Sequence, residues 1–414
     1  MAPSLRICTL LLAFTTIFAS SALVLAWDQA VLSSETPSEQ ALLDYSWIQK
    51  LGAVGDSYAA GLGAGKRLDW SCSRYDHSYP ALLHSSLFLG ANPYRSFQFL
   101  ACSGATSEEV VAKQISALDD DLDIVTVSAG GNDVGLSIIM NHCIYQFFMS
   151  NQDACENALS ETWSKIENEL PGNLTTLLEA LKPKVSKRNG TIYYTGYARF
   201  FGTDDNTCDS ITWAVWSPGS EAAKQYLTLG RRKTMNAMVD AVNKRIKDAV
   251  EKAGDHVVFV DYDDYVAENK GRYCEAGVME PAPNRLGLYF YEWKTVDTGD
   301  NTTALSRAGD DVPKGSFESE IAEWTNRTHQ EHPDWKFGPE DDEKIVLGAG
   351  KERSSEIIGD TVSWLLPDFW KRVFHLRPAG HLLIANLVLD KITETSAKLA
   401  EARVLEEEVF LIDA

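Results

Sequence analysis

The amino-acid sequence predicts an α/β fold, a three-layer α/β/α sandwich around a central parallel sheet. Two observations predict it. Short runs of apolar, β-branched and aromatic residues recur along the chain, which is typical of strands buried on both faces of a parallel sheet. Segments with helical spacing of apolar residues separate these runs, and such alternation forms right-handed crossovers. The predicted strands are residues 48–54, 97–102, 123–128, 191–197 and 256–261.

The segments between the strands predict helices. Thr106 can cap the first of them, with Glu108 and Glu109 complementing the partial positive charge of the helix N-terminus. The predicted helices are residues 106–118, 155–181, 220–253 and 378–401. Because the carboxyl ends of parallel strands meet at one edge of the sheet, we expect a ligand site there.

A stretch at about residues 275–370 breaks the alternation. It is rich in Asp, Glu, Gly and Pro and contains Trp293, Trp324, Trp335 and Trp364. A segment this long inside a compact domain is an insertion, either a lid or aromatic platform for substrate or a surface excursion whose tryptophans pack together.

The first 26 residues predict a signal peptide. Arg6 is their only charge, an apolar run follows, and Val24 and Ala26 fit the small-residue rule for cleavage before Trp27. The alternative is an uncleaved signal anchor. We therefore expect a secreted, extracellular protein with one domain at 27–414 that includes the insertion.

Composition excludes some partners. The formal net charge of −21 argues against nucleic acid and disfavours docking on an anionic membrane surface. No later segment reaches about 18 uninterrupted apolar residues, so we expect no stable membrane anchor. We expect a monomer.

The cysteines agree with secretion. Of seven cysteines, Cys8 lies in the leader, and the remaining six are Cys72, Cys102, Cys143, Cys155, Cys208 and Cys274. Six cysteines in an oxidising compartment predict three disulfides with fifteen possible pairings, of which sequential pairing is the simplest. No Cys-x-x-Cys or paired-histidine spacing supports a metal site. Candidate N-glycosylation sites are Asn173, Asn189, Asn301 and Asn326.

Gly55-Asp56-Ser57-Tyr58 follows the first predicted strand. Glycine permits a tight turn there, and a nucleophilic serine needs such an exposed turn, a base and donors for an oxyanion. Gly104 can expose its backbone N–H, and the Asn132 side chain can offer a second donor. With the Ser57 N–H, they predict an oxyanion hole. Asp133 is interpreted as a turn or cap residue.

Two histidines near the C-terminus are candidates for the base. Gly380-His381 begins a predicted helix close to the expected site, so His381 is predicted as the base. His375 is interpreted as a structural histidine that holds the same loop.

These blocks resemble the SGNH (GDSL-type) hydrolase superfamily, whose fold is flavodoxin-like. Ser57, Gly104, Asn132 and His381 match its four blocks, over residues 48–275 and 373–390. Further stretches resemble its secreted actinomycete and fungal lipase/esterase branch: Cys72-Ser73-Arg74, Tyr79-Pro80, Gly196-Tyr197-Ala198-Arg199-Phe200-Phe201, Phe259-Val260-Asp261, Arg272-Tyr273-Cys274-Glu275, and His375 with Gly380-His381. That branch also implies sequential disulfides.

The chain departs from the superfamily pattern at Pro378, where an aspartate usually precedes the catalytic histidine. Some members of the branch use a backbone carbonyl instead, so we hypothesise that the Pro378 carbonyl orients His381 in a Ser–His pair. Asp360 or Asp368 are the alternatives.

The resemblance implies hydrolysis of a carboxylic ester with no metal or organic cofactor. The absence of a long apolar lid signal favours a small or polymeric ester as substrate. His381 would deprotonate Ser57, and the oxyanion hole would hold the tetrahedral intermediate. A lipase or phospholipase and a carbohydrate or plant-polymer acyl esterase both remain open. A non-catalytic secreted binding module on the same fold is the alternative from another class.

Overall fold

We describe a computed structural model of the chain. It describes residues 45, 47–69, 71–90, 92–145, 152–186, 190–214, 216–217, 224–292, 295, 330, 336–337 and 372–412. The predicted signal peptide, Asp360, Asp368 and most of the predicted insertion lie outside these residues. The chain divides into two compact units, of which Ser46–Thr395 carries the sheet and every residue discussed below.

A five-stranded sheet forms the centre of this unit, and all of its strands are parallel. Its order is β4-β1-β5-β6-β8, which are Ser96–Phe99, Lys50–Gly55, Ile124–Ser128, Thr191–Thr195 and Val257–Val260. Counted along the chain, this is the order 2-1-3-4-5 of flavodoxin-like sheets. All five predicted strands are confirmed. The order reverses between β1 and β5, the place where such sheets bind ligands at the strands' carboxyl ends.

Gly55 lets β1 end against β5. Its φ is +131°, and a Cβ there would lie 2.1 Å from the Ser128 carbonyl oxygen. Only glycine accepts both the torsion and the close approach. The chain then turns into α2 (Ser57–Ala60) directly at the sheet edge.

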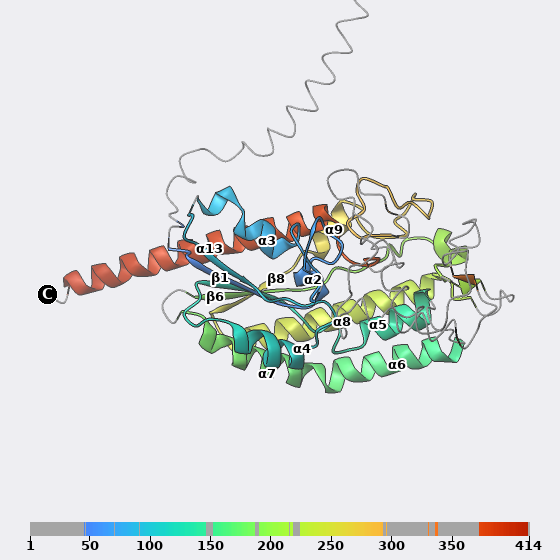
Figure 1. Cartoon of the computed structure of the whole chain (residues 1–414), viewed down its shortest axis with the longest axis horizontal. Helices are drawn as coiled ribbons and strands as arrows, with labels where there is room; N and C mark the ends of the chain where they lie inside the picture. Colours follow the sequence, from blue (N-terminus) through green and yellow to red (C-terminus); the bar gives the residue numbers. More distant parts are fainter. Residues whose placement is uncertain are drawn as a thin grey trace, which may run out of the picture. The chain divides into compact units, whose positions relative to one another are not determined.

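Helices cover both faces of the sheet, which confirms the three-layer prediction (Figure 1). On one face lie α4 (Ser107–Glu109), α7 (Leu170–Leu181) and α8 (Leu229–Ala253); on the other lie α3 (Tyr79–His84) and the first turns of α13 (Pro378–Ile412). The shorter elements are β2 (Arg67–Asp69), β3 (Arg74–Tyr75), β7 (Trp216–Ser217), β9 (Lys336–Phe337), α5 (Leu136–Ile139), α9 (Asp263–Glu268), the π-helical Val110–Gln114 and Met140–Tyr145, and the 3-10 turns Leu87–Leu89, Ile115–Ala117, Lys182–Lys184 and Thr207–Ser210.

Helix boundaries follow local chemistry. Thr106 caps α4 in a capping box with Glu109, as predicted. The single helix predicted at 155–181 is instead two helices, α6 (Gln152–Asn168) and α7. Pro171 lies in the first turn of α7, where its missing N–H is tolerated but where it cannot continue the preceding helix.

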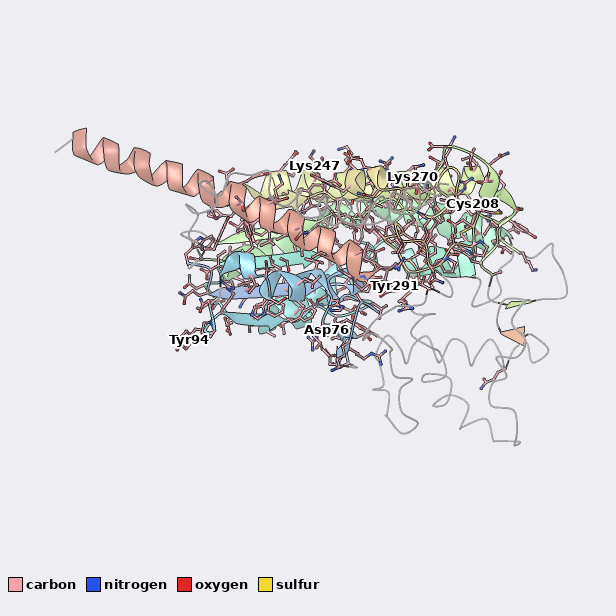
Figure 2. The ribbon with its side chains drawn as sticks, turned by 90° about the horizontal axis from the view of Figure 1, so that it is seen from above. Asp76, Tyr94, Cys208, Lys247, Lys270 and Tyr291 are labelled. Atoms are coloured by element: carbon pink, nitrogen blue, oxygen red, sulfur yellow. A yellow bond between two sulfur atoms is a disulfide. The ribbon has the colours of Figure 1, made fainter. Side chains whose placement is uncertain are left out.

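The segment before α13 is held by a backbone partner far away in sequence. Phe290 pairs with Leu376, and the Tyr291 N–H donates to the His375 carbonyl at 2.8 Å. Tyr291 accordingly lies beside the start of α13 (Figure 2). The residues between Arg372 and Arg377 therefore form a buried, braced loop, which we call the histidine loop.

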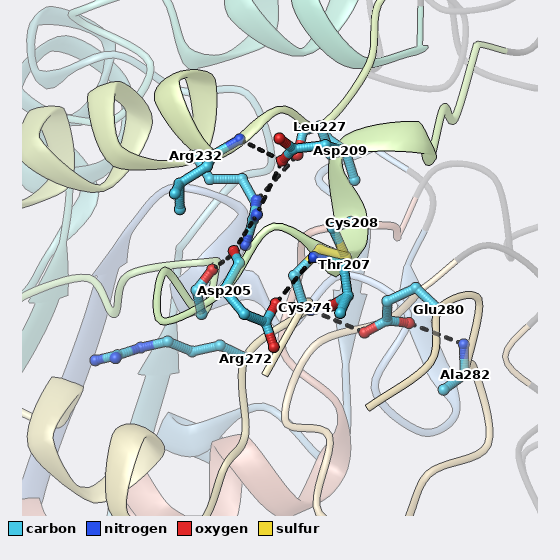
Figure 3. The surroundings of a disulfide bond; sticks show 12 residues. Asp205, Thr207, Cys208, Asp209, Leu227, Arg232, Arg272, Cys274, Glu280 and Ala282 are labelled. Carbon is cyan, nitrogen blue, oxygen red and sulfur yellow. Dashed lines mark hydrogen bonds and ion pairs between the residues drawn. A yellow bond between two sulfur atoms is a disulfide. The ribbon is translucent and has the colours of Figure 1, made fainter. Parts of the chain in front are cut away.

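Three disulfides are present, and they confirm sequential pairing: Cys72–Cys102, Cys143–Cys155 and Cys208–Cys274. The last lies in a polar network in which Glu280 accepts from the Cys274 N–H at 2.8 Å (Figure 3). In the described part of the chain, no helix is both long and apolar enough to cross a membrane.

Candidate active site

Ser57 stands at the carboxyl end of β1, as the first residue of α2. Asp56 caps this short helix by accepting from the Tyr58 N–H at 2.9 Å, and Gly61 ends it with φ +75°. Ser57 as a residue is 8% exposed. This turn leaves its hydroxyl free to face a partner from another part of the chain.

That partner is His375. Its Nε2 lies 2.7 Å from the Ser57 Oγ, and its Nδ1 lies 3.3 Å from the Val373 carbonyl oxygen. If Nδ1 carries the proton and donates it to that carbonyl, Nε2 is left as the acceptor for the serine O–H. The arrangement is a serine–histidine pair oriented by a backbone carbonyl.

The prediction that His381 is the base is wrong. Its ring lies in the first turn of α13, only 1% exposed, and its Nδ1 accepts from the Tyr79 N–H at 3.3 Å. The Pro378 carbonyl is accordingly not the group that orients the histidine facing Ser57, since Val373 supplies that carbonyl. The idea of a carbonyl-oriented pair fits the geometry. The histidine, however, lies six positions before the predicted His381, and the carbonyl lies five positions before the predicted Pro378.

A sequence signal could have found the correct histidine. Proline is favoured at the first position of a helix, so Pro378 places the helix start between the two histidines. His381 then lies on a helix that packs on α3, whereas His375 lies in the preceding loop. Loops at this edge of the sheet are where catalytic side chains are expected.

The histidine loop is fixed by the residue that follows the serine. Tyr58 donates its hydroxyl to the Phe374 carbonyl at 2.7 Å. The Phe374 N–H donates to the Tyr291 carbonyl at 3.0 Å, and its φ is +67°, an uncommon conformation for a bulky residue. Its ring packs on Phe200 with centroids 5.0 Å apart. Sequence reasoning assigned no role to Tyr58, Phe374 or Val373.

The predicted oxyanion donors lie on the two neighbouring strand ends. Gly104 has φ +83°, and within the described part of the chain neither its N–H nor the Ser57 N–H donates a hydrogen bond. The Asn132 Nδ2 donates to the Ala105 carbonyl at 3.0 Å, which ties this side chain to the Gly104 loop and leaves its second amide hydrogen. The oxyanion-hole role of these groups stays a prediction.

Asp133 caps a helix, as interpreted from sequence. Its Oδ2 accepts from the Ser107 N–H at 3.0 Å, and its Oδ1 accepts from the Asn173 amide at 2.9 Å. Asn173 is half-buried, and its side-chain nitrogen holds the loop of Asn132 through Asp133. An N-linked glycan would be attached to this same nitrogen. Asn189, Asn301 and Asn326 lie outside the described residues.

Burial sets the protonation of the site. It lowers the pKa of His375 to about 4, against weaker opposing effects of the Val373 and Arg372 backbone groups. It lowers the pKa of His381 to about 3, helped by the nearby His375 and His77. Both rings are thus neutral at neutral pH, and a neutral His375 is the form that can accept a proton.

Asp56 is buried behind the serine. Burial raises its pKa to about 6, and hydrogen bonds from Tyr197 and Tyr58 oppose that rise. The Tyr197 hydroxyl donates to Asp56 Oδ2 at 2.6 Å and accepts from the Gly131 N–H at 3.1 Å. This chain of hydrogen bonds links the serine turn to the Asn132 loop. Among the described residues, no three His, Cys, Asp or Glu side chains gather as metal ligands.

Comparisons with known proteins identify the family of the chain. The model of the GDSL-like lipase/acylhydrolase family matches residues 53–278, a span that includes Ser57, Gly104 and Asn132. The chain is 33% identical to a lipase of Streptomyces rimosus and 31% identical to lipase 1 of Streptomyces coelicolor, each over 151 residues that make up 36% of this chain. That match spans 52% of each relative, so the chain spans about half the length of the curated relatives it matches.

A solved structure gives a further likeness. The match is to the crystal structure of an extracellular lipase from Streptomyces rimosus, with 26% sequence identity and a TM-score of 0.44. The aligned region covers 55% of this chain and 85% of the lipase chain. The family match rests on more than half of the 414 residues and includes the serine turn itself. The chain therefore belongs to the GDSL-like lipase/acylhydrolase family.

Proposed function

We propose that the protein is a secreted serine hydrolase of carboxylic esters, with Ser57 as nucleophile and His375 as base. The observation that carries the proposal is the 2.7 Å separation of Ser57 Oγ and His375 Nε2 at the carboxyl edge of the sheet. Membership of the lipase/acylhydrolase family supports the reaction class. The three disulfides support an oxidising, extracellular location.

The reaction follows from this pair. His375 Nε2 takes the serine proton while Oγ forms a bond to the ester carbonyl carbon, whose oxygen becomes negatively charged. The N–H groups of Ser57 and Gly104 and the Asn132 amide stabilise that charge. The intermediate collapses, and the alcohol leaves with the proton held by His375. Water then repeats these steps on the acyl-enzyme, releasing the acid and regenerating Ser57.

The Val373 carbonyl has a defined role in this scheme. It accepts the Nδ1–H of His375 at 3.3 Å, which keeps Nε2 unprotonated and turned toward Ser57. A carbonyl orients the ring without adding a negative charge. Its interaction with the transient imidazolium is therefore weaker than that of a carboxylate.

The test compares the wild type with Ser57→Ala. We expect a fluorophosphonate probe to label the wild type alone, and the variant to lose about 10³-fold or more in kcat on p-nitrophenyl esters. Acetylated xylan and phosphatidylcholine in the same panel separate carbohydrate esters from lipids. Absence of both labelling and turnover in the folded wild type would overturn the proposal in favour of a binding module.

A further inference from the structure

Tyr197 lies in the segment 196–201, which directly follows β6 and contributes no group to the proposed reaction. Tyr197 is buried, and so are Phe200 and Phe201 of the same segment. Burial of an aromatic ring at this edge of the sheet therefore does not require a hydroxyl. The hydroxyl of Tyr197 must serve another purpose.

This hydroxyl joins two loops at the carboxyl edge of the sheet. It donates to Asp56 Oδ2 at 2.6 Å and accepts from the Gly131 N–H at 3.1 Å. Asp56 directly precedes the proposed nucleophile, and Gly131 directly precedes Asn132. A phenol can donate and accept at once, whereas the ring of phenylalanine can do neither. One oxygen atom thus links the serine turn to the Asn132 loop.

The side chain of Asn132 is tied in another direction. Its Nδ2 donates to the carbonyl of Ala105, the residue after Gly104. This bond fixes the asparagine against the Gly104 loop, and the Tyr197 hydroxyl fixes the same asparagine loop against the serine turn. Because three donors must meet at one oxygen in the proposed oxyanion hole, both spacings matter.

Tyr197 is itself held firmly. Asn243 of α8 clamps its backbone, since Oδ1 accepts from the Tyr197 N–H at 2.8 Å and Nδ2 donates to the Tyr197 carbonyl at 2.7 Å. The ring contacts that of Tyr58 edge-to-face, with centroids 5.2 Å apart. Burial, and then the charge of Asp56, raise the pKa of Tyr197 well above its usual range, so the hydroxyl keeps its proton.

We propose that Tyr197 is a positioning residue, whose hydroxyl holds the Asn132 amide at the spacing from the Ser57 N–H at which both donors reach the oxyanion. The inference rests on the proposed function and adds a residue to it. Tyr197 acts through Asn132 and does not touch the substrate. A displacement of about 1 Å can cost about 100-fold in rate, so loss of this link should lower kcat and leave substrate binding unchanged.

Tyr197→Phe removes the hydroxyl and keeps the ring. On p-nitrophenyl butyrate we expect kcat to fall by about 10- to 100-fold, with KM within about twofold of the wild type. Asn132→Ala alone should lose about 10²- to 10³-fold in kcat, and adding Tyr197→Phe to it should cost less than about threefold more. Losses that simply multiply, or a change in KM with kcat unchanged, would overturn the proposal.

Tyr194→Phe is the matched control. Tyr194 lies on β6, is fully buried and donates its hydroxyl to the Ala129 carbonyl at 3.2 Å. Its substitution also removes a buried hydrogen bond, so it reports what loss of stability alone does to turnover. We expect kcat within about threefold of the wild type in protein that thermal melts show to be folded. An equal fall in both phenylalanine variants would refute the specific role of Tyr197.

Asn243→Ala covers the case in which Tyr197→Phe does not fold. It releases the backbone of Tyr197 and leaves the hydroxyl in the chain, so kcat should fall by about three- to tenfold. In the Asn132→Ala background this fall should shrink to less than about twofold. Wild-type kcat in folded Asn243→Ala, or a fall that persists without Asn132, would contradict the proposal.

Asn236→Ala is the control for that variant. Asn236 of the same helix clamps Phe201 in the same way, accepting from its N–H at 3.2 Å and donating to its carbonyl at 2.7 Å. Any effect of Asn236→Ala on kcat should be the same with and without Asn132, and coupling as large as that of Asn243→Ala would count against the proposal. Fluorophosphonate labelling of the wild type decides the proposed function, whereas these ratios between active variants decide the role of Tyr197, so the two can fail separately.

Discussion

His375 and His381 lie close together in sequence, yet their rings have different surroundings in the folded chain. His375 faces Ser57 and a backbone carbonyl, whereas His381 is enclosed beside Tyr79. Asparagine offers a matched test, since its side-chain amide can replace Nδ1 but cannot act as a base. We expect His375→Asn to lower kcat by about 10²- to 10⁴-fold on p-nitrophenyl butyrate.

His381→Asn is the control for that variant. Its Oδ1 can keep the hydrogen bond from the Tyr79 N–H, so turnover should stay within about threefold of the wild type, although the smaller side chain can lower the melting temperature. Thermal melts of both variants separate lost chemistry from lost fold. The assignment of the base to His375 fails if the two substitutions reduce kcat equally in folded protein.

Burial of His375 also predicts the pH dependence of turnover. Its pKa is lowered to about 4, so the ring stays neutral and able to accept the serine proton well below the usual histidine range. We expect kcat/KM to remain constant from pH 8 down to about 5.5 and then to fall with an apparent pKa near 4. A pH–rate profile in stopped assays measures it, and an acid limb near 6.5 would contradict the lowered pKa of the half-buried ring.

At the scale of elements, the histidine loop depends on Phe290 and Tyr291, whose backbone pairs with it. Next to that segment, Glu292 is fully buried, and the buried Glu280 accepts from the Cys274 and Ala282 N–H groups. Glu292 Oε2 accepts from the Ala282 N–H at 3.1 Å, so the two carboxyl groups share one donor. Burial, and then the nearby Glu280, raise the pKa of Glu292 well above its usual range. The hydrogen bond from the Ala282 N–H and, more weakly, the charge of Arg285 oppose this rise. The pair therefore keeps a proton at neutral pH.

The raised pKa fixes the sign of a stability effect. The folded chain holds a proton that the unfolded chain releases, so the free energy of unfolding should fall as the pH rises above the ordinary carboxyl range. Glu292→Gln, which cannot ionise, should show a smaller fall between pH 5 and pH 9 in denaturant titrations. Glu268→Gln, at an exposed position of α9, is the control and should keep the wild-type slope. Equal slopes in wild type and Glu292→Gln would contradict the protonated pair.

Elements were easier to predict from the sequence than the contacts between them. All five strands were predicted because their buried, β-branched runs are local signals. Ser57, Gly104 and Asn132 were placed at the sheet edge because each lies in the turn or loop that follows a strand. The histidine that faces Ser57 was missed because Pro378 was not used to separate the two histidines. The bridge of Phe290 to Leu376, which braces the loop of His375, is a contact across 86 positions that no local pattern encodes.

At the scale of the whole molecule, the disulfides constrain the unfolded chain by different amounts. Cys208 and Cys274 are 66 residues apart, whereas Cys143 and Cys155 are 12 apart. Closing a longer loop removes more entropy from the unfolded chain, about 4 kcal/mol for the first spacing and about 3 kcal/mol for the second. On the Cys208 side of the long bridge, the Arg232 guanidinium donates to the Gly202 carbonyl at 2.6 Å. It also donates to Asp209 at 3.2 Å (Figure 3).

We therefore expect the double substitution Cys208→Ala with Cys274→Ala to lower the free energy of unfolding more than Cys143→Ala with Cys155→Ala. The expected losses are about 4 and about 3 kcal/mol, within the range of about 2–5 kcal/mol that removal of native bridges causes. Guanidinium titrations of the two variants and the wild type, all without reductant, measure the difference. The reduced wild type provides the reference in which every bridge is open. If the short bridge proved the more stabilising one, local strain or packing around Cys208 would outweigh chain entropy, and the entropic ranking would be wrong for this fold.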